Sequence, residues 1–175
     1  MFLFSCGGKD GNGAEADLYF PTEKTLADQV DSLGRSADMW TKTVAESGKN
    51  EAKTVAAKDI DWGTELAMFH DLNQNKKAYV GKFTVQTETP DSIKMTTYTS
   101  ADLKLKSLVV LQNADETVKA VYGDLETSNL FYNSSYKLSL VPYKAFAIEG
   151  MQKLNFFNTQ RNFSIVWLKN TPAPL

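Results

Sequence analysis

Apolar side chains recur at helical spacing in the first quarter of the chain. The spacing alternates between steps of four and three residues at Leu26, Val30, Leu33, Ala37, Trp40 and Val44. Such a stripe occupies one side of an α-helix, and Thr25 with Asp28 resembles a capping box. Because Gly48 is a suitable C-terminal stop, the pattern predicts a long helix over residues 25–47. Packing on a sheet is the favoured interpretation of the stripe, and a coiled-coil seam is the alternative.

A second, shorter helix is expected beyond a polar loop at residues 46–51. It begins at Asp59 or Asp61 and ends near residues 73–75. Its apolar positions, again one turn apart, are Trp62, Leu66, Phe69 and Leu72. The first 75 residues are therefore predicted to be mainly helical.

From Lys77 onward, apolar residues alternate with polar ones, and many of them are β-branched or aromatic. This alternation, broken by short turn sequences, is typical of antiparallel strands. The expected strands lie near residues 78–87, 92–99, 103–112, 117–126, 135–142, 143–149 and 162–168. Two helices followed by about seven strands predict an α+β fold, in which a long and a short helix pack on a curved antiparallel sheet. A small barrel is the alternative architecture.

The chain of 175 residues has the length of one domain. Residues 1–17 combine an apolar start with a segment rich in glycine and polar residues, which predicts a flexible tether. We expect a single α+β domain over residues 18–170 and a C-terminal tail over residues 171–175.

The most specific local motif runs from Leu3 to Cys6 and is followed by two glycines. It resembles the lipobox of bacterial lipoproteins, in which a small residue precedes a cysteine that is acylated and becomes the first mature residue. The resemblance implies a signal peptide and lipidation of Cys6, with a free surface thiol or a buried cysteine as alternatives. Because a signal peptide has about 7–15 apolar residues before its cleavage site, we expect the natural start to lie upstream.

The motif, the tether and the excess of lysine over arginine together resemble small outer-membrane lipoproteins of the Bacteroidota. This resemblance implies a cell-envelope location, with the membrane as partner through acyl chains on Cys6. The domain would face the periplasm or the cell surface. Two or more acyl chains anchor a protein stably in a membrane, whereas a single chain gives only weak, reversible membrane binding.

The charge balance argues against a nucleic-acid partner. The formal net charge is −2, and Arg35 and Arg161 are the only arginines among 19 basic residues. Bidentate recognition of phosphate or guanine favours the arginine fork over the lysine ammonium. We therefore expect no nucleic-acid binding.

Few residues suggest a catalytic or metal-binding site. His70 is the only histidine, which argues against a zinc site and, with Cys6 on a tether, against a Cys–His pair. Since Leu66 and Ala67 precede His70 by one helical turn, a partly buried or capping role is favoured over a general base. Strand pairing could bring Glu149 near Asp124 or Glu126, although their spacing does not select a reaction.

The sequence contains no glycine-rich phosphate loop and no nucleophile elbow. We therefore assign no catalytic, cofactor-binding or metal-binding residues and expect that the protein is not an enzyme. The resulting hypothesis is a lipid-anchored envelope protein that acts as a non-catalytic binding or assembly module for an envelope protein or a small ligand. The alternatives are a carrier for a small apolar ligand or glycan, and an enzyme of unknown reaction that uses His70.

Overall fold

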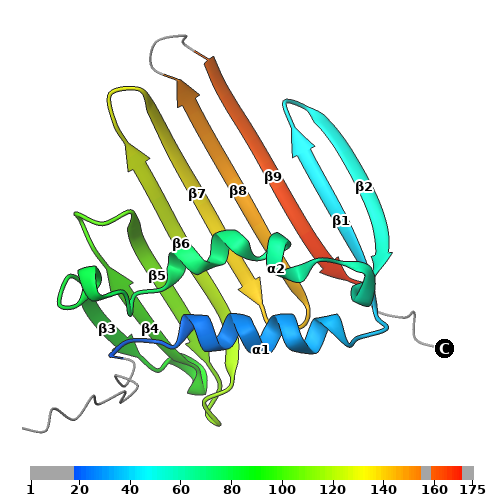
Figure 1. Ribbon diagram of the computed structural model, residues 1–175. Helices are drawn as coiled ribbons and strands as arrows, with labels where there is room; N and C mark the ends of the chain where they lie inside the picture. The colour runs from blue at the N-terminus through cyan, green and yellow to red at the C-terminus, as the bar shows by residue number, and fades with distance from the viewer. Residues whose placement is uncertain (1–17, 155–158, 171–175) are drawn as a thin grey trace, which may run out of the picture.

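The computed structural model describes residues 18–154 and 159–170, and its main feature is one nine-stranded antiparallel sheet (Figure 1). The strands are β1 (Met39–Glu46), β2 (Lys49–Ala56), β3 (Thr84–Glu88), β4 (Lys94–Thr99), β5 (Leu105–Gln112), β6 (Val118–Ser128), β7 (Tyr132–Val141), β8 (Ala145–Leu154) and β9 (Thr159–Lys169). Their order in the sheet is β2-β1-β9-β8-β7-β6-β5-β4-β3. Strands β3 to β9 thus form a meander, to which the N-terminal hairpin β1–β2 is added through β1 and β9.

The helical segments are short and lie in front of the sheet in the view of Figure 1. They are α1 (Thr22–Gly34), α2 (Trp62–Glu65) and the 3₁₀ segments η1 (Ala57–Asp59), η2 (Ala67–Leu72), η3 (Lys77–Tyr79) and η4 (Pro90–Ser92). We call the sheet face beneath α1, α2 and η2 the helical face, and the opposite one the open face.

The core lies between the helical face and these helices. Its aromatic centre is built from Trp40 of β1, Trp62 of α2, Phe69 of η2, Phe146 of β8 and Trp167 of β9. The Trp40 and Trp62 rings meet edge to face with centroids 5.0 Å apart, a geometry that aromatic rings favour. The Trp62 indole donates a hydrogen bond of 2.8 Å to the carbonyl oxygen of Ala57, so this buried polar group is satisfied.

The expected fold class, in which a long and a short helix pack on a sheet of about seven strands, was wrong. The helix α1 ends at Gly34, and residues 39–46 form β1 instead of the second half of a helix. A step of four residues returns a side chain to nearly the same side of a helix and to the same face of a strand, so the step from Trp40 to Val44 fits both. The intervening Thr41 and Thr43 are β-branched and favour the strand.

The expected ends of the helices also need correction. Helix α1 begins at Thr22 with Pro21 as its N-cap, and no side chain caps it. Thr25 donates to the carbonyl oxygen of Pro21, and Asp28 pairs with Lys24, so the two do not form a capping box. The second helix is divided into α2 and η2, although its four expected apolar residues are all buried.

The antiparallel strands expected after residue 77 are present, but the first of them begins later. Residues 77–79 form the 3₁₀ segment η3, and β3 starts at Thr84. The chain continues as a strand through Gly150 to Leu154. With β1 and β2 added, the sheet has nine strands instead of seven.

Candidate functional site

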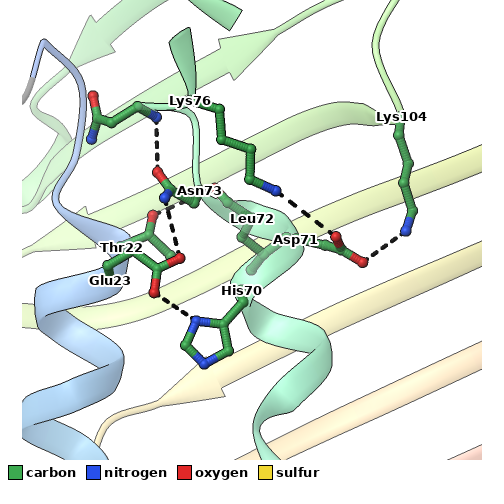
Figure 2. Close-up of polar contacts among 9 residues, drawn as sticks. Thr22, Glu23, His70, Asp71, Leu72, Asn73, Lys76 and Lys104 are labelled. Atoms are coloured by element: carbon green, nitrogen blue, oxygen red, sulfur yellow. Dashed lines mark hydrogen bonds and ion pairs between the residues drawn. The ribbon is translucent and has the colours of Figure 1, made fainter. Parts of the chain in front are cut away.

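The first candidate region surrounds His70, on the outer side of η2. Its Nδ1 lies 2.6 Å from Oε2 of Glu23 in α1, and the other carboxylate oxygen accepts a hydrogen bond of 3.1 Å from Asn73 (Figure 2). The side chains of His70 and Glu23 are about half exposed, at 51% and 48%. Their exposure makes this pair a surface contact that ties η2 to α1.

A second set of charges lies beside His70. Asp71 accepts a hydrogen bond of 2.7 Å from Lys104, and Lys76 approaches the same carboxylate at 4.0 Å (Figure 2). Both lysines follow η2 in the sequence: Lys76 comes shortly after it, and Lys104 directly precedes β5. These ion pairs are exposed and contribute little stability each, so their main effect is to orient η2 on the sheet.

The second candidate region is the open face, on which one row of side chains, polar except for Ala45, crosses seven strands. Direct cross-strand neighbours in this row, from β5 to β2, are Ser107, Asp124, Lys137, Glu149, Ser164, Ala45 and Asn50. Directly opposed residues of antiparallel strands point to the same side of the sheet. Because the helices lie against the other face, this row faces away from the core.

At the centre of the row, the Lys137 ammonium stands between two carboxylates. Asp124 and Glu149 are two strand spacings apart, about 10 Å, with Lys137 on the strand between them. Among the described residues, neither carboxylate lies within 4.0 Å of that ammonium. Asp124 instead accepts a hydrogen bond of 2.7 Å from Ser107. Lys137 and Glu149 are exposed and can both contact a ligand.

Two hollows share the central charges. The larger has a volume of about 640 Å³, and its polar lining includes Asn50, Ser135, Lys137, Glu149, Asn162 and Ser164. The smaller, of about 190 Å³, is lined by Tyr122 and Asp124 together with Lys137 and Glu149. The same two side chains, Lys137 and Glu149, border both hollows, and we call the two hollows together the open-face groove.

A further ion pair joins β1 to β9 on the helical side of the sheet, because Glu46 is directly opposite Phe163, which packs against the core. Glu46, at the turn between β1 and β2, pairs with Arg161 of β9. Arg161 Nη2 lies 2.8 Å from Oε2 of Glu46, and its hydrogen bonds hold the pKa of that carboxyl below its usual value. The Glu46 carboxyl therefore stays ionised to a lower pH than an ordinary glutamate.

The other end of the open face is apolar. Its exposed large side chains, outside the groove, are Met39, Val166 and Leu168, at 44%, 37% and 55% exposure. Val166 is opposite Thr43 and Leu168 is opposite Thr41 in the register of β1 and β9. The open face is thus divided into a polar groove and a smaller apolar area.

By contrast, the space between the helices and the sheet is filled. The hollow bounded by α1, η2, β6 and β7 has a volume of about 10 Å³ and is lined by core residues such as Leu26, Phe69 and Leu140. This volume is at the lower limit for a single water molecule. A ligand of ordinary size therefore has more room on the open face than under α1.

The residues singled out by sequence have separate locations. Cys6 lies outside the described residues, so its expected lipidation stays a prediction. His70 acquires a carboxylate partner, Glu23, from 47 positions away in the chain. Asp124 and Glu149 come to one face, as strand pairing allowed, but Lys137 separates them. The sequence did not indicate Lys137 as a site residue, because its neighbours depend on strand register.

Within the described part of the chain, no group of three or more His, Cys, Asp and Glu side chains is placed to hold a metal ion. Over the same residues, no helix combines the length and apolar character required to cross a membrane. Comparison with protein-family models, with curated proteins and with solved structures finds no match to this chain. The site must therefore be interpreted from its own geometry.

Proposed function

We propose that this protein is a non-catalytic binding module, held at the outer membrane by acyl chains on Cys6, that binds an oligosaccharide in the open-face groove. The observation that carries the proposal is the groove itself. It has room for a ligand of several rings, while the interior hollow under α1 does not. The domain would face the periplasm or the cell surface, and the membrane would be its partner through the lipid.

The lining of the groove supports a hydroxyl-rich ligand. Lys137 donates, Glu149 accepts, and the amides of Asn50 and Asn162 do both, so hydroxyl groups of either orientation find partners. The Tyr122 ring, 43% exposed, offers an apolar surface beside these charges. Sugars present both hydroxyl edges and apolar ring faces, which this combination matches. Within the alternatives named from sequence, the lining therefore favours a glycan over an apolar ligand.

The non-catalytic part of the proposal is supported by the arrangement of the charged residues. The carboxylates of Asp124 and Glu149 lie on opposite sides of a lysine, and His70 is on the helical side of the molecule. A general acid and base must both reach the same bond. The groove and the His70 pair belong to different surfaces and cannot act on one ligand together.

A panel of neutral and acidic oligosaccharides, immobilised on an array and followed by titration calorimetry of the best ligand, tests the groove. Tyr122→Ala, Lys137→Ala and Glu149→Ala are each expected to weaken binding by about tenfold or more, as central contacts of a binding site do. Tyr143→Ala and Lys144→Ala, in the exposed turn between β7 and β8, are the matched controls and should bind normally. Equal binding by all five variants, or no binding to any oligosaccharide, would overturn the proposal.

The anchor is tested separately in bacteria that carry the full-length gene. Wild-type protein should incorporate radioactive palmitate and sediment with the outer membrane, whereas Cys6→Ala should do neither. Because Cys6 lies far in sequence from the groove, Cys6→Ala is expected to keep its oligosaccharide affinity. Labelling of the variant to the wild-type level would show that Cys6 is not the acylated residue.

A further inference from the structure

Strand β2 forms one edge of the sheet, and its outer side has no partner in the described structure. In Figure 1 it lies at the end of the sheet opposite β3. Residues 49–54 are all exposed. Free backbone donors and acceptors on an edge strand are a template for pairing with another strand.

The turn between β1 and β2 fixes which backbone groups of β2 point outward. Ser47 and Gly48 both have positive φ, 50° and 82°, so this two-residue loop has the character of a type I′ turn. The flanking pair, Glu46 and Lys49, is hydrogen-bonded across the turn. At the other end of the hairpin, the Ala57 N–H donates to the carbonyl oxygen of Asp38.

The backbone pairings at the two ends of the hairpin therefore predict the same alternation of inward- and outward-pointing backbone groups along β2. The odd-numbered residues direct their N–H and C=O groups toward β1. The even-numbered residues Asn50, Ala52 and Thr54 direct theirs away from the sheet. Within the described chain, these three residues make no backbone hydrogen bond outside the strand ladder.

The side chains of β2 make this edge complementary to itself. Lys49, Glu51 and Lys53 lie on one face of the strand with charges that alternate in sign. If two copies of β2 pair antiparallel with Ala52 opposite Ala52, Glu51 of each copy stands opposite Lys53 of the other. In this register Asn50 faces Thr54, and all three outward-pointing residues pair.

Other registers fit less well. A register centred on Glu51 or Lys53 also brings outward-pointing residues together, but it places like charges opposite each other. A register centred on Asn50 pairs only the first residues of the two β2 strands. A register centred on Thr54 places no opposite charges across from each other. The Ala52 register combines two Glu–Lys pairs with about six backbone hydrogen bonds, because each hydrogen-bonded pair exchanges two.

We propose that two copies of this chain dimerise by antiparallel pairing of their β2 edges, centred on Ala52, into one continuous sheet. Lysines on an edge strand normally prevent pairing. Here the Lys–Glu–Lys alternation instead restricts the edge to a strand of the same charge pattern. Opposed residues share a face, so the helices of both copies lie on one side of the joined sheet and their open-face grooves on the other.

Sedimentation equilibrium of the 175-residue chain over a range of concentrations, with reducing agent present so that Cys6 cannot cross-link two chains, tests the dimer. Wild type should be a dimer at high concentration. Glu51→Lys and Lys53→Glu should each raise the dissociation constant by about tenfold, since both attractive pairs become repulsive. The combined Glu51→Lys/Lys53→Glu variant restores opposite charges and should dimerise like wild type.

A substitution that removes a backbone N–H group tests the proposed dimer independently of charge. Ala52→Pro removes an outward N–H from the centre of the interface and should leave the chain folded but monomeric, whereas Ala52→Val keeps that N–H and should remain dimeric. Circular dichroism establishes that each variant is folded. A wild type that stays monomeric throughout would overturn the proposal. So would dimerisation of the single charge variants at wild-type strength, or growth into open-ended oligomers through β2 and β3.

Discussion

Gly123 of β6 shows how closely the helical segment approaches the sheet. A Cβ atom at this position would lie 2.2 Å from a methyl carbon of Leu72 in η2. Leu72 is itself buried, at 1% exposure, so it has little room to move. The absence of a side chain at residue 123 therefore allows η2 to rest directly on β6.

Substitution of Gly123 by alanine should lower the free energy of unfolding by about 1–3 kcal/mol, the usual effect of overpacking a core. Urea denaturation followed by tryptophan fluorescence measures this loss. In the Leu72→Ala background the added methyl has space, so the two losses should sum to less than their separate values. Strict additivity would mean that Leu72 is not the residue that Gly123 accommodates.

At a polar position, Glu65 of α2 links three elements. Its carboxylate accepts hydrogen bonds of 2.7 and 2.8 Å from Lys42 of β1 and of 2.8 Å from the Trp167 indole of β9. The Lys42 and Glu65 side chains retain 28% and 22% exposure. Glu65 thereby satisfies the indole N–H of a core residue while its charge remains in contact with a cation.

Among the elements, the segment from α1 to β2 differs most from its sequence-based prediction. The apolar stripe was correctly assigned to the core at Leu26, Leu33 and Trp40, which are all buried. Its division into a helix and a strand was missed, because a step of four is common to both periodicities. Gly34 lies inside the helix expected over residues 25–47, whereas in the structure it is the last residue of α1.

Two glycines in this segment should respond in opposite ways to alanine. Gly34 has open space around its Cβ position and no left-handed backbone, so Gly34→Ala should raise the free energy of unfolding by about 0.5–1 kcal/mol. Gly48 has φ +82° in the β1–β2 turn, so Gly48→Ala should lower it by about 1–2 kcal/mol. Thermal and urea denaturation of both variants measure the two shifts. A destabilised Gly34→Ala would show that the helix end is not as described.

For the whole molecule, the alternation after residue 77 was sufficient to predict an antiparallel sheet. It could not predict that β1 and β2 extend the sheet beside β9, because that pairing joins residues more than 100 positions apart. The groove could not be predicted from the sequence either, because it depends on the strand register that places Lys137 between Asp124 and Glu149. The hydrophobic pattern of a strand shows which of its side chains share a face. The register between paired strands decides which side chains of different strands become neighbours.

The pairing of β1 with β9 also has a consequence for how the chain folds. Strands β3 to β8 can each pair with a strand that is next to them in sequence, whereas the β1–β2 hairpin joins the rest of the sheet only through β9. Contacts over such separations form slowly, because a long loop must close first. We therefore expect the β1–β2 hairpin to join the sheet late in folding, once residues 159–169 are available to pair with β1.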